Sequence, residues 1–322
     1  MDTLRLGTRG SELALVQANA VAALLTARAG VRCEIVVIKT SGDRLAEASL
    51  AQIGGKRLFV KEIEDALLAG DVDLAVHSSK DMPAVLPTGL HIGAVLPREE
   101  PLDAIVLPGG TASLSLQEIE GALGREPRIG TSSIRRVAQL ARHFPGATFL
   151  PVRGNLGTRL RKLDAGEYDA LVLAAAGLRR LGRTDRISAT IPVDVCVPAP
   201  GQGIIAVEIR DHDARVKEVV AQVDDPDAAA ALRAERAVVT RLGGGCQMPI
   251  GALAAMRSRE LAVRGVVISP DGTRMVDGNS EGASADAERL GIEVADQLLR
   301  RGAGDILAAA QRAHAAVEGI QP

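Results

Sequence analysis

Short β-rich runs alternate with stretches of helical periodicity over the first two thirds of the chain. The runs VDLAVHS at 72–78 and DALVLAAAG at 169–177 are almost continuously apolar. Strands of this kind are typical of parallel sheets that helices cover on both faces. Between such runs, apolar residues recur with helical spacing, as they do over 58–69 just before Gly70. The alternation therefore predicts an α/β fold built from βα units.

Two segments rich in proline interrupt this alternation and predict hinges between domains. They are LPREEP at 96–101 and IPVDVCVPAPGQG at 191–203. A lone strand follows at 203–210, and we expect it to return to the first sheet. From residue 213 two helices precede a hairpin with a PDG turn, which is the pattern of a smaller α+β domain. At roughly 150 residues per domain, the chain of 322 residues is predicted to divide into 1–98 with 198–212, 99–197, and 213–322.

Composition excludes several classes of function. The net charge of −2 and the 1% content of aromatic residues argue against a nucleic-acid binder. Cys33, Cys196 and Cys246 lie far apart and form no CxxC pair, which argues against a disulfide framework and a thiolate zinc site. No run approaches the roughly 18 apolar residues of a membrane helix, and the N-terminus has no apolar signal core. We expect a cytoplasmic protein that acts on a small molecule, without a metal.

The motif HSSKDMP at 77–83 follows a predicted strand and places Ser78, Lys80 and Asp81 at its carboxyl end. In open α/β sheets that edge faces the ligand crevice. Lys80 beside Asp81 puts a base next to an acid, although a solvated Lys–Asp turn would give the same pattern. We expect His77, which precedes this turn, to be a satisfied scaffold residue.

Basic side chains recur where predicted strands pass into helices. GTSSIRR at 130–136 ends in Arg135 and Arg136, and Arg153 follows the next strand. Adjacent helix residues diverge by about 100°, so at most one of the paired arginines is expected to point inward. A Ser133 cap with surface arginines is the alternative. Because Arg binds carboxylates with a planar fork of donors, the recurrence favours a basic crevice for an acidic ligand.

The motif GGGCQMPIG at 243–251 places Cys246 after three glycines. Such a turn lets the backbone approach another group closely and exposes the sulfur, which favours a reactive or derivatised thiol. A free Cys is otherwise most often a small buried hydrophobe. No His lies within a few residues, so a cysteine-protease arrangement has no local support.

These motifs together resemble those of the porphobilinogen deaminase family over about residues 4–256. The matching segments are LGTRGSELAL, GGK…LFVKEIE, HSSKDMP, GTSSIRR, RGNLGTRL, GEYDALVLAAAGL, PAPGQG and GGGCQMPIG, in that order. The resemblance implies a transferase of tetrapyrrole (haem) biosynthesis. Such an enzyme joins four porphobilinogen molecules head to tail, loses ammonia at each step and releases hydroxymethylbilane. It also implies two periplasmic-binding-protein-like lobes with mainly parallel sheets, and a smaller C-terminal α+β domain that carries the cofactor cysteine.

By motif match, the resemblance implies a role for each of these residues. Asp81 would be the catalytic carboxylate, and Cys246 would hold a dipyrromethane cofactor through a thioether. The implied cofactor-binding residues are Lys80, Asp81, Thr131, Ser132, Ser133, Arg135, Arg136, Arg153, Gly154, Arg159 and Gln202. The implied substrate-binding residues are Arg9, Ser11, Lys56, Ser78, Arg153 and Arg180. Two positions depart from the family pattern, since Arg57 and Gly243 stand where Gly and an acidic residue are usual.

The implied chemistry explains this choice of residues. Porphobilinogen carries two carboxylates, so local clusters of Arg would hold a growing chain. Loss of ammonia leaves a cation, which a fixed, buried carboxylate at Asp81 is expected to stabilise. We expect a monomer in which hinges near 97–102 and 193–200 and the Cys246 loop move to make room for the chain.

Two other functions stay open from the residues alone. A two-lobed ligand-binding protein of the periplasmic type would explain the α/β halves and the basic crevice, but not the cysteine domain. A thiol-dependent hydrolase would use Cys246 without a local His. Intact mass separates these functions, because the enzyme interpretation alone predicts an adduct of two pyrrole units on Cys246.

Overall fold

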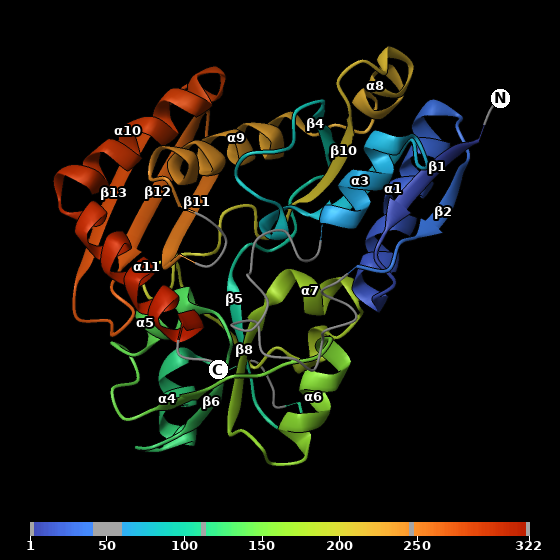
Figure 1. Ribbon diagram of the computed structural model, residues 1–322. Helices are drawn as coiled ribbons and strands as arrows, with labels where there is room; N and C mark the ends of the chain where they lie inside the picture. The colour runs from blue at the N-terminus through green and yellow to red at the C-terminus, as the bar shows by residue number, and fades with distance from the viewer. Residues whose placement is uncertain (1–2, 41–59, 111–113, 245–247, 320–322) are drawn as a thin grey trace.

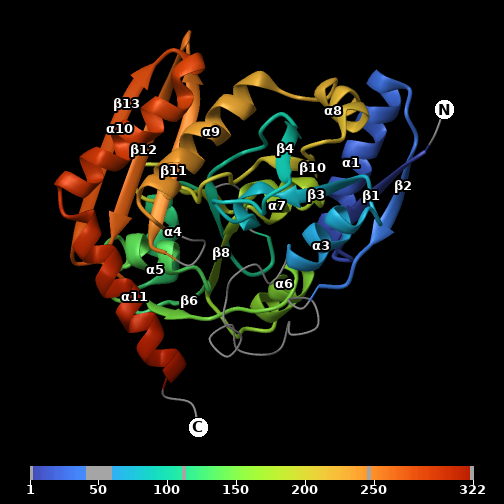
Figure 2. The same cartoon turned by 45° about the horizontal axis from the view of Figure 1, so that its top comes forward.

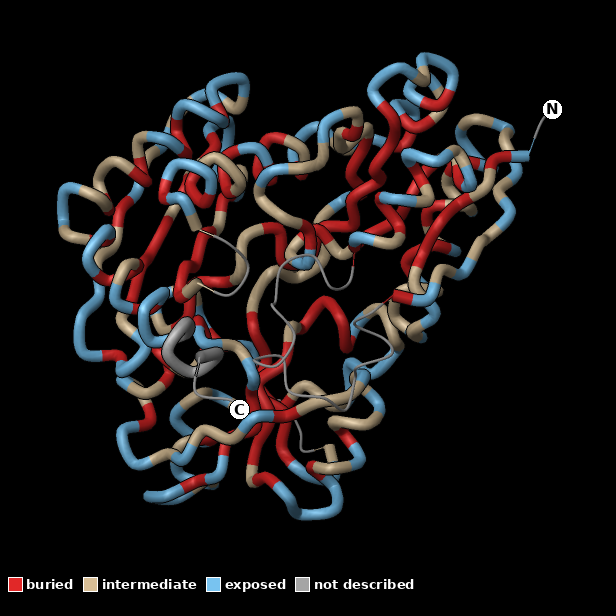
Figure 3. The backbone as a smooth tube through the Cα atoms, in the orientation of Figure 1, coloured by how far each residue is buried: buried red, intermediate tan, exposed pale blue. Residues whose placement is uncertain are grey.

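The computed structural model describes residues 3–40, 60–110, 114–244 and 248–319. These residues form two five-stranded sheets and one three-stranded sheet, each with its own helices (Figure 1). Figure 3 shows that buried residues concentrate in the strands of the sheets, while the connecting turns are largely exposed. The protein is therefore α/β, with two lobes and a smaller C-terminal α+β part, as the sequence predicts.

The first sheet contains four strands that run in the same direction and one reversed strand from a later segment. Its order is β2-β1-β3-β10-β4, and β10 runs antiparallel to both of its neighbours. The strand expected to return to this sheet thus lies within it, between β3 and β4. The strands are β1 (Leu4–Thr8), β2 (Cys33–Val37), β3 (Leu74–Ser78), β4 (Leu90–Val95) and β10 (Ile205–Arg210). Helices α1 (Glu12–Ala29), α3 (Lys61–Ala69) and α8 (Ala214–Ala221) pack against it.

Strand β4 was not predicted, because Gly93 weakens the β signal of its sequence. A Cβ atom at Gly93 would lie only 2.5 Å from Cδ1 of Ile209 in the neighbouring strand. The glycine is therefore required for β4 to pair closely with β10.

The second sheet has the order β7-β6-β8-β5-β9, with β7, β6 and β8 parallel and β5 antiparallel to its neighbours. The predicted strand at 169–177 is shorter than expected, since Ala175–Arg180 already forms helix α7. Periodicity cannot separate strand from helix in a short run that is buried throughout. The strands are β5 (Asp103–Val106), β6 (Arg128–Gly130), β7 (Thr148–Leu150), β8 (Ala170–Ala174) and β9 (Ala189–Thr190), and the other helices are α4 (Leu116–Leu123), α5 (Ile134–Leu140) and α6 (Leu156–Asp164).

The C-terminal part is an antiparallel meander covered by helices. Val263 of the central strand belongs to the same buried core as Val238, Leu290 and Val294 of the helices. Figure 2 shows α9 lying between this meander and the first sheet, and α9 contacts both β11 and β4. The elements are α9 (Pro226–Arg241), β11 (Ile250–Arg257), β12 (Glu260–Ile268), β13 (Met275–Gly282), α10 (Ala287–Arg300) and α11 (Ala303–Gly319).

The chain crosses between the first two sheets twice, once between β4 and β5 and once between β9 and β10. We propose the three-part division predicted above, with one adjustment. Helix α8 packs into the core of the first sheet through Val216 and Val220, so we place the start of the C-terminal domain after α8. None of the described helices is long and apolar enough to cross a membrane.

Candidate functional site

A cavity of about 510 Å³ lies where the two lobes and the C-terminal part meet. The turn η2 (Ser79–Asp81), the start of α5, the loop after β7 and helix α9 all contribute to its wall. Met248, two residues beyond Cys246 in the chain, also lines it. The hydroxyl residues Ser132 and Ser133 also line the cavity, as does Pro200 of the second proline-rich segment.

The wall of this cavity is strongly basic. Six cationic side chains line it, and no Asp or Glu stands among the described lining residues. Burial lowers the pKa of Lys80 to about 8, although neighbouring Asp81 raises it. Burial also lowers the pKa of Arg159, with nearby Arg136 adding to the effect. Concentrated positive charge of this kind favours an acidic ligand. The six cations are Lys80, Arg135, Arg136, Arg153, Arg159 and Arg236.

Arg135 and Arg136 converge on one carboxylate, that of Asp103 at the start of β5. Nη1 of Arg135 lies 2.7 Å from Oδ2 of Asp103, and Nη2 of Arg136 lies 2.8 Å from Oδ1. All three side chains are buried. The prediction that at most one of the two arginines points inward is therefore wrong, because long side chains from adjacent helix positions bend toward a shared partner. The alternative of surface arginines is equally excluded.

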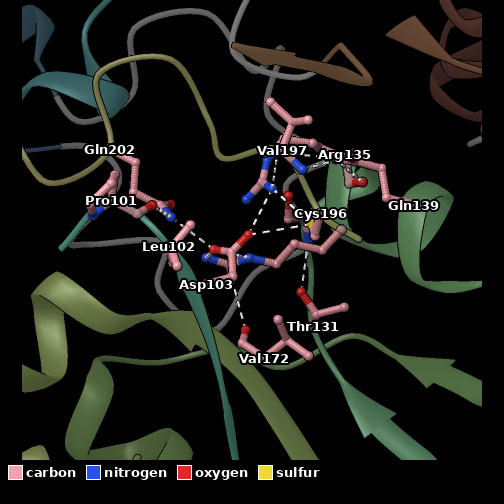
Figure 4. Close-up of polar contacts among 12 residues, drawn as sticks. Pro101, Leu102, Asp103, Thr131, Arg135, Gln139, Val172, Cys196, Val197 and Gln202 are labelled. Atoms are coloured by element: carbon pink, nitrogen blue, oxygen red, sulfur yellow. Dashed lines mark hydrogen bonds and ion pairs between the residues drawn. The ribbon is translucent and has the colours of Figure 1, made fainter. Parts of the chain in front are cut away.

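Two hinge residues complete the surroundings of Asp103, as Figure 4 shows. Nε2 of Gln202 donates to Oδ1 of Asp103 over 2.9 Å and to the carbonyl of Pro101 over 2.7 Å. The thiol of Cys196 lies 3.5 Å from Oδ2, and burial raises its pKa to about 12. Cys196 is therefore a protonated structural thiol at pH 7. The two arginines hold the pKa of Asp103 well below its usual range, despite its burial.

The hydroxyl groups before α5 make local backbone contacts. Oγ of Ser132 donates to the carbonyl of Val152 over 2.8 Å and accepts from its N–H over 3.0 Å. Ser133 occupies the cap position of α5 without a side-chain capping bond, and it faces the cavity. Thr131 is buried and accepts from the N–H of Ser133 over 3.4 Å. Of these three residues, Ser132 and Ser133 line the cavity.

Gly154, in the loop after β7, contacts Arg159 of helix α6, which lines the cavity. Gly154 has φ +100°, and a Cβ atom there would lie 2.7 Å from Cγ2 of Thr158. Nε of Arg159 donates to the carbonyl of Gly154 over 2.8 Å. The side chain of Asn155 caps α6 by accepting from the N–H of Thr158, as expected for Asn at a helix start. These contacts fix the loop that carries Arg153 to the start of α6, the helix that carries Arg159.

A second, smaller cavity of about 60 Å³ lies on the other side of η2. Arg9, Ser11, Ser78 and Asp81 line it, so all the predicted substrate-binding residues of the first lobe that the structure describes meet there. The hydroxyl of Ser11 also caps α1 by accepting from the N–H of Ala14. Asp81 is exposed, so the expectation of a buried acid is wrong. The turn after β3 places Asp81 beyond the end of the strand, where its side chain is exposed.

His77, beside this turn, is a buried scaffold residue as predicted. Its Nε2 lies 3.0 Å from Oε2 of Glu208 in the neighbouring strand β10. Ser78 exchanges hydrogen bonds with the amide of Gln17 over 2.9 and 3.0 Å. The first contact ties β3 to β10, and the second ties the end of β3, just before η2, to helix α1.

Arg180 lies apart from the other predicted arginines. Its Nη2 donates to the carbonyl of Gly203 over 2.6 Å, and it lines neither of the two cavities. In this structure Arg180 therefore holds the second crossing segment.

Three residues singled out from the sequence, Lys56, Arg57 and Cys246, lie outside the described residues. Gly243 is described and has φ +66°. The N–H of Gly243 donates to Thr240 and that of Gly244 to Val239, which closes the end of α9. A left-handed residue at a helix end favours glycine, which explains why Gly serves well here in place of the usual acidic residue.

Sequence reasoning missed two buried acids, Asp103 and Glu235. Glu235 accepts from the N–H groups of Gly201 and Ala254 over 2.6 and 2.7 Å, and it pairs with Arg98. It thereby ties both crossing segments to the C-terminal part. In the sequence, Asp103 follows the first proline-rich segment and Glu235 lies within a helical stretch. Acidic residues at such positions are too common for the sequence to single out these two.

Comparisons with known proteins agree with this geometry. Residues 4–218 match the family model described as "Porphobilinogen deaminase, dipyromethane cofactor binding domain", and residues 229–300 match "Porphobilinogen deaminase, C-terminal domain". The chain belongs to the porphobilinogen deaminase family. The porphobilinogen deaminase of Moorella thermoacetica is 48% identical over 95% of this chain and 96% of its own length. That of Desulforudis audaxviator is 49% identical over 94% and 96%, respectively.

Solved structures of much lower similarity match part of the chain. The periplasmic VFT2 domain of BvgS from Bordetella pertussis has 17% sequence identity and a TM-score of 0.39, over 69% of this chain and 86% of that one. We draw nothing further from so distant a likeness.

The described residues fit the dipyrromethane cofactor of this family. Six cationic side chains line the large cavity, and no Asp or Glu is among its described lining residues. Such a wall suits a group rich in carboxylates. Met248 on its wall places the predicted attachment residue within two positions of the cavity. Within the described ranges, no group of three His, Cys, Asp or Glu side chains could hold a metal ion.

Proposed function

We propose that this protein joins four porphobilinogen molecules head to tail, with loss of ammonia at each step, and releases hydroxymethylbilane. The observation that supports this most strongly is the basic cavity, which both lobes and the C-terminal part line, the latter in part through Met248, two positions from Cys246 in the chain. A transferase acting on an acidic, growing chain needs such a cavity, because each added unit brings two more carboxylates. The other functions left open by the sequence do not account for the family membership over the whole chain.

Asp81 is the proposed general acid. Its carboxyl group would donate a proton to the departing amine as the carbon–nitrogen bond breaks and ammonia leaves. The resulting carboxylate would then face the cation left on the substrate and lower its energy until the new carbon–carbon bond forms.

The two cavities divide the proposed binding roles. Arg9, Ser11 and Ser78 of the small cavity would bind the incoming substrate. The large cavity would bind the carboxylates of the cofactor, and of each porphobilinogen unit that joins it, through Lys80, Arg153, Arg159, Arg135 and Arg136. When bound, the dipyrromethane supplies the tethered pyrroles on which the chain starts, and a thioether to Cys246 would make each coupling effectively intramolecular. The predicted roles of Lys56, Thr131, Ser132, Ser133, Gly154, Arg180 and Gln202 remain part of this proposal.

Room for a longer chain would come from movement at the two crossing segments, near 97–102 and 193–200, and of the Cys246 loop. We also propose a monomeric, cytoplasmic enzyme. The motion predicts that successive intermediates differ in lobe separation by small-angle scattering, and an unchanged profile would contradict it.

The direct test of function is turnover of porphobilinogen by the purified protein. We expect four molecules of ammonia for each linear tetrapyrrole released. Ammonia without a tetrapyrrole product, or no consumption of porphobilinogen by correctly folded protein, would refute the proposal.

A further inference from the structure

Asp103 is the shared partner of two arginines that line the large cavity. Nε and Nη2 of Arg136 donate to Oδ1 of Asp103 over 3.0 and 2.8 Å, and Nη1 of Arg135 pairs with Oδ2. Arg136 also donates to the carbonyl of Val172, and Arg135 to that of Val197. Each guanidinium is therefore held by a carboxylate and by a backbone carbonyl, which fixes both its position and its plane.

The remaining contacts of Asp103 saturate the carboxylate. Gln202 donates to Oδ1 over 2.9 Å, and the Cys196 thiol lies 3.5 Å from Oδ2. A carboxylate has about four lone-pair sites, so Asp103 has no acceptor left for a ligand. It is fully buried and does not line the cavity. Asp103 therefore contacts the arginines and the hinge but cannot contact the substrate.

We propose that Asp103 is a positioning residue, which holds Arg135 and Arg136 in the orientation that binds the acidic chain. The inference rests on the proposed function of the cavity. One carboxylate shared by two guanidinium groups leaves one net positive charge facing the cavity, while it offsets the cost of burying both cations. A guanidinium group that is already fixed in position loses less conformational entropy when it binds a ligand carboxylate.

The hinge is part of the same arrangement. Gln202 lies in the second crossing segment, and its backbone carbonyl accepts from Nε of Arg98 in the first, over 2.9 Å. Its side chain reaches Asp103. Movement of either crossing segment would therefore act on the carboxylate that orients the two arginines.

A different role for Asp103 makes the opposite prediction. If Asp103 competed with the ligand for Arg135 and Arg136, its removal would free positive charge and tighten binding. If it positions the arginines, its removal weakens binding even though the site becomes more positive. The sign of the change in affinity therefore decides between the two roles.

The test compares Asp103→Asn, which keeps the shape but removes the charge, with Asp103→Glu, which keeps the charge but displaces it by one methylene. We expect KM for porphobilinogen to rise about tenfold or more in Asp103→Asn, equivalent to about 1.4 kcal/mol. We expect a smaller rise in Asp103→Glu. Intact mass serves as a readout separate from turnover, and the fraction of Asp103→Asn protein that carries the cofactor should fall.

Asp169→Asn is the matched control. Asp169 pairs with Arg128 over 2.8 Å in the same lobe, but this pair is exposed and lies outside both cavities. KM and cofactor loading should be unchanged in this variant. If Asp103→Asn does not fold, the decision rests on Asp103→Glu, judged at a thermal stability close to that of the natural protein. A lowered KM, or an unchanged KM and full cofactor loading in a folded Asp103 variant, would overturn the proposal.

Discussion

Lys80 and Asp81 are adjacent in one turn, yet they line different cavities. Lys80 faces the large basic cavity, whereas Asp81 faces the small one with Arg9 and Ser78. The turn η2 therefore separates a group suited to holding carboxylates from a group suited to proton transfer. This separation gives the two residues distinct predicted phenotypes.

Asp81→Asn should lower kcat by about 100–1000-fold or more, because an amide can neither protonate the departing amine nor balance the cation. The thermal midpoint should stay unchanged, since Asp81 is exposed. Steady-state turnover and thermal unfolding check both expectations. Glu218→Gln, an exposed acid on α8, is the control, and near-normal turnover in Asp81→Asn would refute the assigned role.

Lys80 should give the cofactor-free protein a specific pH dependence of stability. Its pKa is about 8 in the folded protein, against an ordinary 10.5. Between these values the unfolded chain binds more protons, so the free energy of unfolding gains a contribution that rises with pH. Below about 8 that contribution is absent. We therefore expect Cys246→Ala protein to gain stability from pH 8 to pH 10.5 relative to Cys246→Ala/Lys80→Met protein.

Urea unfolding at several pH values measures this difference. Parallel stability curves for the two proteins would show that Lys80 is not a partly buried cation whose pKa is lowered next to Arg136.

Gly154→Ala should destabilise the loop that presents Arg153. The substitution puts a side chain at φ +100° and within 2.7 Å of Thr158, so the cost combines backbone strain of about 1–2 kcal/mol with a steric clash. Gly166→Ala is the control, because Gly166 has φ +78° but nothing within 4 Å of its Cβ position. Chemical denaturation should show a larger loss for Gly154→Ala, and equal losses would argue against the clash.

Glu235→Gln should lower the free energy of unfolding by about 3–5 kcal/mol, because it leaves a partly buried Arg98 without its carboxylate. The exposed pair Arg241–Asp296 provides the comparison. Asp296→Asn should cost no more than about 1 kcal/mol. Denaturation midpoints measure both variants, and similar losses would show that Glu235 does not anchor the crossing segments.

Local sequence patterns identified most of the scaffold. The apolar run before His77 predicted β3, because a buried strand needs consecutive apolar residues. The glycine after Ala69 predicted the end of α3, because the chain reverses there. The proline-rich segment at 191–203 marked the second crossing for the same reason. Strand β4 was not predicted, because Gly93 is unusual in a strand. Its close approach to Ile209 explains the glycine, but Ile209 lies far away in the sequence.

The candidate site was predicted less completely, since its contacts join distant residues. Asp103 lies 33 positions from Arg136 and 99 positions from Gln202. Nothing near Asp103 in the chain reveals these partners. Helical geometry alone also misjudged Arg135 and Arg136, because their long side chains converge on a carboxylate that another strand supplies.

The central claim is that Cys246 holds a dipyrromethane on which the chain grows within the basic cavity. Intact mass spectrometry of the purified protein, before and after addition of porphobilinogen, tests it most directly. We expect a mass increase of two pyrrole units in the untreated protein, absent in Cys246→Ala, and further increments of one unit after porphobilinogen is added. A protein that is fully active at the mass of its bare polypeptide would contradict the account.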